Sequence, residues 1–301
     1  MDILTRLKAL LGESNVLADE PMKNHTSFRT GGNADYFILP ENEEDIKKAI
    51  SFLKKEGIKY YIFGNGSNML VSDKGIEGAV IKIGNAFSDI KVNGTEMIIG
   101  SGALLSSVAN AALNNSLKGF EFASGIPGSF GGAVFMNAGA YGPEIKDVIK
   151  WVKVIDDKLE TKVIYKEDMG LGYRTSNFQK NGYIILEGAI ELEKGIKEDI
   201  SALMNELNSR RRDKQPLNFA SAGSTFKRPE GHFAGKLIED CGLKGKTVGG
   251  AMVSEKHAGF VVNTGSATTD DILSVMEICK KEVKEKFLID LEPEVRFIGR
   301  A

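Results

Sequence analysis

Residues 125–142 read GIPGSFGGAVFMNAGAYG, a run in which glycine, alanine and serine outnumber all other residues together. Glycine permits backbone conformations with φ > 0 and lets a phosphate or a ring approach the main chain closely. A run of this length leaves few side chains to fill the space around it. We therefore expect a flat cofactor to occupy that space. Tight structural turns are the alternative that the composition leaves open.

A second glycine cluster, FGNGSN at residues 63–68, follows a strand-like run at residues 59–63. It differs from the dinucleotide-binding fingerprint, because Met69 stands where the third glycine belongs and no helical pattern begins there. No Gly-Lys-Ser/Thr follows either cluster, so neither is a P-loop. The two clusters therefore predict a nucleotide site of another kind, or structural turns.

The rest of the chain alternates helical and strand-like patterns irregularly, which favours an α+β fold over one doubly wound sheet. Apolar residues repeat at helical spacing in four segments, and we expect all four to pack into a core: Ile46/Ala49/Ile50/Leu53, Leu104/Val108/Ala111/Ala112, Ile196/Ile200/Leu203/Met204/Leu207 and Ile272/Met276/Cys279/Val283/Phe287. Strands are predicted at residues 59–63, 79–83, 151–155, 183–190, 259–262 and 295–298. The basic stretch at residues 210–216 closes the third helix and predicts a lobe boundary.

Bulk properties exclude several classes of protein. The 301 residues carry a net charge of −2, which gives no support for non-specific binding to nucleic acid. Cys241 and Cys279 lie far apart without a CxxC pattern or a histidine cluster, so we expect neither a disulfide framework nor a metal site. No apolar run is long enough for a membrane span or typical of a signal peptide. We expect a cytoplasmic protein without membrane or nucleic-acid partners.

Three further segments could carry chemistry: LGYRTSNF at residues 171–178, SAGSTFKRP at 221–229 and LEPEVRFIG at 291–299. As a strand, the last segment would place Glu292, Glu294 and Arg296 on one face and Leu291, Val295 and Phe297 on the other. It is then either an edge strand with a wet face, or a carboxylate and a guanidinium directed into a cleft. Ser224 lacks the G-x-S-x-G context of a hydrolase nucleophile.

The order of these motifs resembles one known family. Residues 24–35 (NHTSFRTGGNAD), 64–68 and 125–142 are similar to the UDP-N-acetylenolpyruvoylglucosamine reductases, whose FAD-binding fold is shared with vanillyl-alcohol oxidase and p-cresol methylhydroxylase. The resemblance extends from about residue 24 to the C-terminus. It implies two FAD-binding lobes, residues 1–82 joined by 291–301 and residues 83–210, and a smaller α+β substrate-binding lobe at 211–290. A short run from Arg174 to the third helix resembles the shorter type, which lacks a tyrosine-bearing capping loop.

The resemblance also implies the cofactor residues. FAD would bind non-covalently, with its pyrophosphate at residues 64–68 and the remaining contacts in the second cluster. His25 has a capping or packing role instead of attachment to the flavin. NADPH would be the reductant, and we expect a monomer. The implied cofactor-binding residues are Gly64, Asn65, Gly66, Ser67, Asn68, Gly125, Ile126, Pro127, Gly128, Ser129, Gly132, Asn137, Gly139, Ala140 and Tyr141.

In the family, the active site falls on Arg174, Ser224 and Glu294. Hydride from flavin N5 would add to the enolpyruvyl ether of UDP-N-acetylglucosamine enolpyruvate, Ser224 would supply the proton, and Arg174 with Glu294 would stabilise the enolate. The product is UDP-N-acetylmuramate, a peptidoglycan precursor. Substrate contacts are expected from Tyr173, Lys227, Arg228 and Arg296, although many members carry asparagine where Arg228 stands. A flavin oxidase of the same fold, and a nucleotide-binding protein without catalysis, are the competing interpretations.

Overall fold

The computed structural model describes residues 2–300, which form two compact units. Among the described residues, unit 1 contains 2–17, 36–65 and 79–211, and unit 2 contains 18–35, 66–78 and 212–300. The chain passes from one unit to the other inside strands β1 (Val16–Pro21), β2 (Asn33–Ile38) and β5 (Ile76–Lys82), between Asn65 and Gly66, and inside helix α7 (Lys197–Lys214). Neither unit is therefore a continuous piece of sequence.

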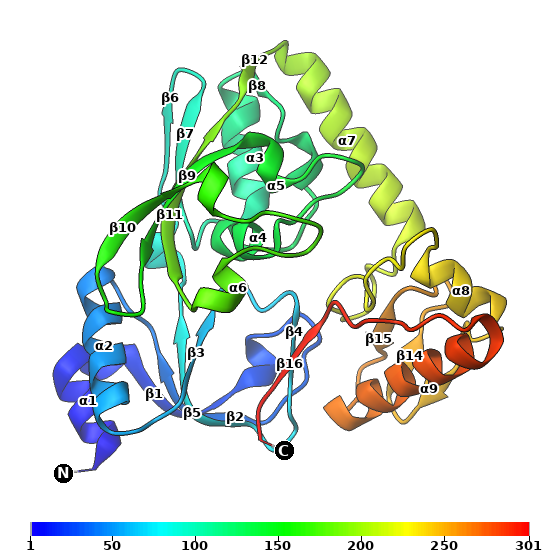
Figure 1. Ribbon diagram of the computed structural model, residues 1–301, viewed down its shortest axis with the longest axis horizontal. Helices are drawn as coiled ribbons and strands as arrows, with labels where there is room; N and C mark the ends of the chain where they lie inside the picture. Colours follow the sequence, from blue (N-terminus) through cyan, green and yellow to red (C-terminus); the bar gives the residue numbers. More distant parts are fainter. Residues whose placement is uncertain (1, 301) are drawn as a thin grey trace. The chain divides into compact units, whose positions relative to one another are not determined.

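Unit 1 is built on an antiparallel sheet with the strand order β10-β9-β11-β7-β6. Helices α3 and α4 lie on the same side of this sheet (Figure 1). The core between them is formed by residues such as Ile99, Val108, Phe130 and Val152. The elements are β6 (Ile90–Asn93), β7 (Glu96–Gly100), α3 (Leu105–Asn114), α4 (Phe130–Met136), α5 (Ile145–Val148), β9 (Ile149–Ile155), β10 (Thr161–Tyr165), α6 (Phe178–Asn181) and β11 (Ile184–Glu191).

A second layer of unit 1 packs α1 (Ile3–Leu11) and α2 (Glu43–Lys55) against a smaller core. Asn42 caps α2 by accepting a hydrogen bond from the amide of Asp45 at 3.0 Å. Strand β3 (Tyr60–Phe63) pairs in parallel with β5, the two forming one edge of the β1-β2-β5-β3 sheet. The glycine cluster at residues 64–68 follows directly from the end of β3, where the chain leaves the sheet.

Unit 2 contains a three-stranded sheet, β13 (Thr247–Val248), β14 (Ala251–Val253) and β15 (Val261–Asn263), against which the long helix α9 (Thr269–Phe287) packs. Thr268 and Asp271 form a capping box at the start of α9. The short helix α8 (Ala234–Asp240) lies beside α9. Strand β4 (Met69–Val71) pairs in parallel with β16 (Arg296–Ile298), which brings the second glycine cluster next to the C-terminal segment.

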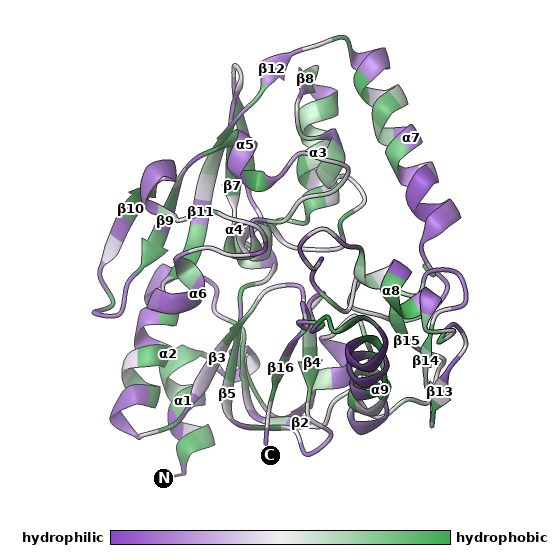
Figure 2. Ribbon diagram, turned by 45° about the vertical axis from the view of Figure 1, so that its right-hand side comes forward, coloured by the Kyte–Doolittle hydropathy of each residue, from purple (hydrophilic) through white to green (hydrophobic). Residues whose placement is uncertain are grey.

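The predicted helices and strands are present with shifted ends, and three apolar residues expected in the core are exposed instead. Ile196 is 63% exposed, Leu203 is 42% exposed and Leu104 is 44% exposed. Ile196 and Leu104 precede the first turns of α7 and α3, and only Ile200, Met204 and Leu207 of α7 are buried. Figure 2 shows α7 with many hydrophilic residues along its length, whereas α3 is mostly hydrophobic.

The C-terminal segment also differs from the expected single strand. Strand β16 begins at Arg296, and Pro293 instead forms an isolated bridge to Phe226. Leu291 and Val295 are buried as expected, but Phe297 is 48% exposed. The predicted alternation of buried and exposed side chains therefore fails at Phe297. There the chain pairs with β4 and no longer with the segment that carries Phe226.

Candidate functional site

The first glycine-rich segment contains a helix that its composition did not predict. Helix α4 begins after Ser129, and its first two amides donate to the chain that follows β7: Phe130 to Ala103 O at 2.8 Å and Gly131 to Ser101 O at 2.8 Å. A Cβ on Gly131 would lie 2.7 Å from Ser101 Cβ. At Gly131 the space around the glycine run is therefore filled by the protein itself, contrary to the expectation that a cofactor fills it.

The two glycine-rich segments meet at Ser129 and Gly64. The hydroxyl of Ser129 is buried and has no hydrogen-bond partner among the described residues. A Cβ on Gly64 would lie 2.5 Å from that hydroxyl, so the two segments approach as closely as a glycine permits. An unpaired buried hydroxyl costs free energy unless something binds it. We call Ser129 and Gly64, where the two segments meet, the polar cradle; binding of an anionic oxygen there stays a prediction.

The second glycine cluster offers main-chain donors. Within the part of the chain that the structure describes, the amides of residues 64–68 donate no hydrogen bond to a protein acceptor. Gly66 has φ +66°, and its main chain contacts that of His25 so closely that a Cβ would lie 1.9 Å from His25 O. Successive unpaired amides in a turn suit a phosphate group. The amides of Gly64 and Asn65 in unit 1 are therefore available for a phosphate of a nucleotide cofactor, and this role stays a prediction.

Asn137 organises the end of the glycine-rich segment. It is fully buried, adopts φ +43° and ends α4. Its side chain donates to Glu144 at 3.0 Å and to Gly172 O at 2.8 Å, and accepts from the amide of Lys146 at 2.9 Å. These bonds join residues 137–146 to the turn that carries Arg174.

Arg174 is held against the same segment. Its Nη2 donates to Gly139 O at 3.1 Å, and its guanidinium lies 5.2 Å from the centre of the Tyr173 ring. The residue has φ +53°, and Gln179 donates to its carbonyl at 3.1 Å. Within unit 1 the structure therefore brings together Arg174, Tyr173 and the cofactor candidates around Gly139.

Ser224 and Glu294 lie on neighbouring segments of unit 2. The amide of Glu294 donates to Thr225 O at 2.9 Å, and the amide of Lys227 donates to Glu292 O at 2.8 Å. Ser224 is exposed, whereas Thr225 is fully buried and accepts a hydrogen bond from the amide of Val261. Burial of Thr225 fixes the segment, so that Ser224 remains at the surface beside the segment that carries Glu294.

The four substrate candidates are distributed over both units. Tyr173 belongs to unit 1, and the other three belong to unit 2. The ammonium of Lys227 is paired with Glu292. The guanidinium of Arg228 lies 4.4 Å from the centre of the Phe233 ring, a cation–π geometry, and Arg296 is exposed at the start of β16. Their roles as substrate contacts stay predictions.

His25 has the packing role that its surroundings suggested. Its Nε2 lies 2.9 Å from Glu20 Oε1, and its amide caps the preceding turn by donating to Met22 O at 2.9 Å. Cys241 and Cys279 are both unpaired, and burial raises the pKa of the Cys279 thiol to about 12. Non-covalent binding of FAD stays a prediction.

No sequence pattern distinguishes Arg211 from Arg210 and Arg212. In the structure Arg211 is half-buried, and a Cβ on Gly125 would lie 2.6 Å from Arg211 Cδ, so its side chain covers the start of the glycine-rich segment. Burial lowers the pKa of its guanidinium, and Tyr141 acts in the opposite direction. No ion pair to Arg211 is present among residues 2–300. The neighbouring Arg210, in contrast, pairs with Glu206 on the surface.

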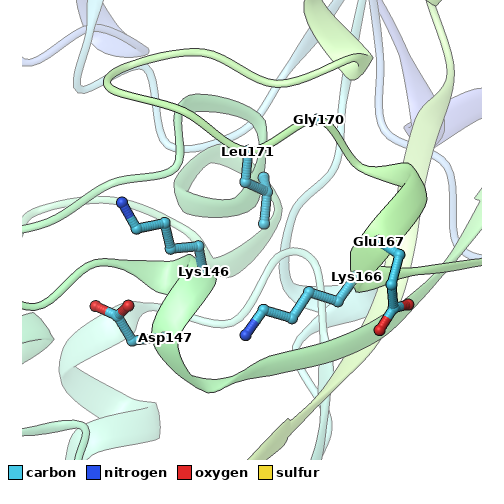
Figure 3. Close-up of a pocket in the computed structure, with 6 residues that line it drawn as sticks. All are labelled: Lys146, Asp147, Lys166, Glu167, Gly170 and Leu171. Atoms are coloured by element: carbon cyan, nitrogen blue, oxygen red, sulfur yellow. The ribbon is translucent and has the colours of Figure 1, made fainter.

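One surface pocket has a lining residue, Lys146, that is hydrogen-bonded to Asn137. It has a volume of about 500 Å³ and is lined by Lys146, Asp147, Lys166, Glu167, Gly170 and Leu171 (Figure 3). None of its six lining residues is among the cofactor, catalytic or substrate candidates. We therefore assign it no part in the site.

Comparison with known proteins identifies the family. The model of the UDP-N-acetylenolpyruvoylglucosamine reductase C-terminal domain matches residues 215–298, and that of an FAD binding domain matches residues 34–162. A UDP-N-acetylenolpyruvoylglucosamine reductase from Caldanaerobacter subterraneus subsp. tengcongensis is 50% identical over 99% of this chain and 98% of its own length. This chain belongs to the UDP-N-acetylenolpyruvoylglucosamine reductase family.

Two further relatives agree with this assignment. The reductase from Clostridium botulinum (strain 657 / Type Ba4) is 53% identical over 99% of this chain and 97% of its own length. The crystal structure of the reductase from Thermus caldophilus aligns with a TM-score of 0.81 at 34% identity, covering 94% of this chain and 97% of that one. The resemblance inferred from the motifs, the α+β fold of the FAD-binding type and the FAD cofactor are thus confirmed.

Several expectations remain open after this comparison. The three-lobe division and the roles of individual residues stay predictions, as does the monomeric state. No helix among residues 2–300 is long and apolar enough to cross a membrane. The family assignment favours a reductase over the two competing interpretations, an alcohol- or phenol-oxidising flavoenzyme and a non-catalytic binding protein.

Proposed function

We propose that this chain is an FAD-containing, NADPH-dependent oxidoreductase that reduces UDP-N-acetylglucosamine enolpyruvate to UDP-N-acetylmuramate. The reaction is a cytoplasmic step of peptidoglycan precursor synthesis. Family membership along nearly the whole chain supports the reaction. The observation that supports this site is the hydrogen bond from the amide of Glu294 to Thr225 O, because Thr225 directly follows Ser224.

The proposed cofactor site in unit 1 is the polar cradle together with the amides of Gly64 and Asn65. Ser129 Oγ and the amides of Gly64 and Asn65 would bind phosphate oxygens of FAD. When FAD is bound there and reduced by NADPH, it would supply the hydride for the terminal carbon of the enolpyruvyl group. The protein's own residues then deal with the negative charge and with the proton.

Arg174 and Glu294 stabilise the charge that develops on the substrate. Addition of hydride leaves an enolate that spreads onto the substrate carboxylate. A guanidinium held in place by Gly139 O needs little reorganisation to bind that carboxylate, and the protonated carboxyl group of Glu294 can donate a hydrogen bond to it. Preorganised donors of this kind contribute about 3–4 kcal/mol each in comparable sites.

Ser224 donates the proton. Its hydroxyl proton would transfer to the enolate carbon next to the carboxylate, and the resulting alkoxide would recover a proton from solvent. The exposed position of Ser224 permits this exchange. A serine hydroxyl is a weak acid, but an enolate of this type is a strong base, and the serine adds no charge to an already anionic site.

Arg211 is the additional residue that the structure suggests for this site. A half-buried guanidinium without an ion pair among the described residues is poorly solvated, and a bound anion would relieve that cost. Its position over Gly125 places it at the start of the cofactor segment. It would bind an anionic group of FAD or of the UDP-sugar.

The decisive experiment measures NADPH consumption by the purified holoenzyme with and without UDP-N-acetylglucosamine enolpyruvate. We expect rapid oxidation only when the enolpyruvate is present, with formation of UDP-N-acetylmuramate. Initial-rate patterns should be ping-pong, because NADPH and the substrate must meet the same flavin in turn. A purified protein that neither contains nor binds FAD would contradict the proposal.

A further inference from the structure

Two asparagines of the second glycine cluster bind two different functional segments through their side-chain amides. Asn65 Nδ2 donates to Pro127 O at 2.9 Å within unit 1, and Asn68 Nδ2 donates to Glu294 O at 3.0 Å within unit 2. Pro127 lies in the glycine-rich cofactor segment, whereas Glu294 is the candidate active-site acid. Each bond uses one of the two N–H donors of the side-chain amide.

We propose that these asparagines have separate tasks: Asn65 holds the flavin segment, and Asn68 is a positioning residue that fixes Glu294 for the reaction. The inference rests on the proposed function, since it takes Glu294 as the acid that stabilises the enolate. It goes further because it gives the side chain of Asn68 the task of positioning Glu294, and not of binding FAD. The main-chain amide of Asn68 remains available for a phosphate oxygen.

The contacts around Glu294 show how Asn68 acts. The amide of Glu294 donates to Thr225 O at 2.9 Å, and its carbonyl accepts from Asn68. The amide of Arg296 then donates to Asn68 O at 3.0 Å. The two main-chain polar groups of Glu294 are therefore bonded on both sides, to the Ser224 segment through Thr225 and to the glycine cluster through Asn68. This fixes the direction in which the Glu294 side chain leaves the main chain.

The contact made by Asn65 has a different setting. Its hydrogen bond to Pro127 O is exposed, whereas the Asn68 bond is half-buried. Loss of the exposed Asn65 bond should cost less free energy than loss of the Asn68 bond, because water can replace the missing donor. Removal of the Asn65 amide should loosen residues 125–128 only partly, and we expect FAD binding to weaken several-fold. Removal of the Asn68 amide should take away the hydrogen bond that Asn68 donates to Glu294 O and let the acid shift.

The main test compares Asn68→Ala and Asn65→Ala with Asn115→Ala as the matched control. Asn115 Nδ2 also donates to a main-chain oxygen, Ala111 O at 2.8 Å, but on the exposed end of α3 outside both segments. The FAD dissociation constant is measured by flavin fluorescence on the apoproteins. Reoxidation of the NADPH-reduced holoproteins by substrate is then followed by stopped flow.

We expect Asn68→Ala to slow reoxidation by about ten- to a hundredfold, since small misplacements of a catalytic group have effects of this size. Its FAD affinity should stay close to that of the wild type. Asn65→Ala should bind FAD more weakly and should slow reoxidation less than Asn68→Ala does. Asn115→Ala should change neither quantity. Equal effects of Asn68→Ala and Asn65→Ala on both quantities would overturn the inference.

Asn68→Asp gives a signature that simple destabilisation cannot mimic. An ionised carboxylate next to Glu294 O cannot donate, whereas a protonated one can. The reoxidation rate of Asn68→Asp relative to the wild type should therefore rise as the pH falls from 8 towards 5, while the same ratio for Asn68→Ala stays flat. A flat ratio for both variants contradicts the role of Asn68. A wild-type enzyme whose reduced flavin does not react with the enolpyruvate contradicts the proposed function instead.

Discussion

Replacement of Gly66 by alanine tests how tightly the second glycine cluster is packed. A Cβ at this position would lie 1.9 Å from His25 O and 3.0 Å from His25 C. Both atoms belong to the main chain, so a side-chain rotation cannot relieve the clash. Residue 66 also has φ +66°, a conformation that costs an alanine roughly 1–2 kcal/mol.

The expected loss of stability is the sum of three effects. The left-handed conformation contributes roughly 1–2 kcal/mol. Displacement of the His25 main chain resembles overpacking, which costs about 1–3 kcal/mol. The hydrogen bond from the amide of Ser27 to Gly66 O, 3.2 Å long, would be strained, at a cost of about 0.5–1.5 kcal/mol. We therefore expect Gly66→Ala to reduce the free energy of unfolding by roughly 3–6 kcal/mol.

Gly231→Ala is the matched control for this variant. Gly231 lies in the same unit and has φ +71°, but a Cβ there would meet nothing within 4 Å. It should therefore lose only the roughly 1–2 kcal/mol of conformational strain. Urea unfolding of both apoproteins, followed by circular dichroism, measures the difference. Equal destabilisation of the two variants would refute the close contact between Gly66 and His25 as the reason for glycine at this position.

Three further predictions concern single side chains. Ser224→Ala should leave flavin reduction by NADPH unchanged but slow reoxidation by substrate by about a hundredfold or more in stopped-flow half-reactions; near-normal reoxidation would exclude Ser224 as the proton donor. Arg211→Met should raise the FAD dissociation constant about tenfold or more if Arg211 binds FAD, or the KM for the UDP-sugar by as much if Arg211 binds that substrate. The control Arg210→Met should change neither constant. Normal values of both constants for Arg211→Met would show that Arg211 is not part of the site. Burial would raise the pKa of Glu43, but hydrogen bonds, chiefly from Lys47, outweigh it and lower the pKa from 4.5 to about 2. The stabilisation by ionised Glu43 is thus complete above about pH 4.5 and is lost as the pH falls towards 2. In unfolding experiments over that pH range, the difference in free energy of unfolding between the wild type and Glu43→Gln should therefore shrink as the pH falls. A constant difference would contradict the ion pairing of Glu43.

The sequence predicted best those elements whose pattern is local. Helix α9 carries a regular apolar stripe, and α2 carries one that ends in lysines, so both were found without knowledge of their partners. Helix α4 was missed because its stability depends on tertiary contacts. Its first amides bond to the chain after β7, and Phe130 packs where Gly188 of β11 leaves room, 3.1 Å from the position of a Cβ.

The candidate site shows the same limit. The ordered motifs indicated FAD and the catalytic residues through family resemblance, but they did not reveal which side chains hold which segments. Asn65 and Asn68 find partners 62 and 226 positions away, and no local pattern encodes such contacts. Arg211 is one of three consecutive arginines, and only the packing of α7 against Gly125 distinguishes it from Arg210.

The parallel pairing of β4 with β16 bears on how the protein is made. Strand β4 cannot pair with β16 until residues 296–298 have been synthesised. Unit 2 therefore lacks this strand pair until then. During that interval, apolar residues such as Leu70 lack their final neighbours, including Val295. The growing chain should therefore depend on chaperones that shield exposed strands, and a ribosome that stalls before residue 296 should release a product that is degraded rapidly.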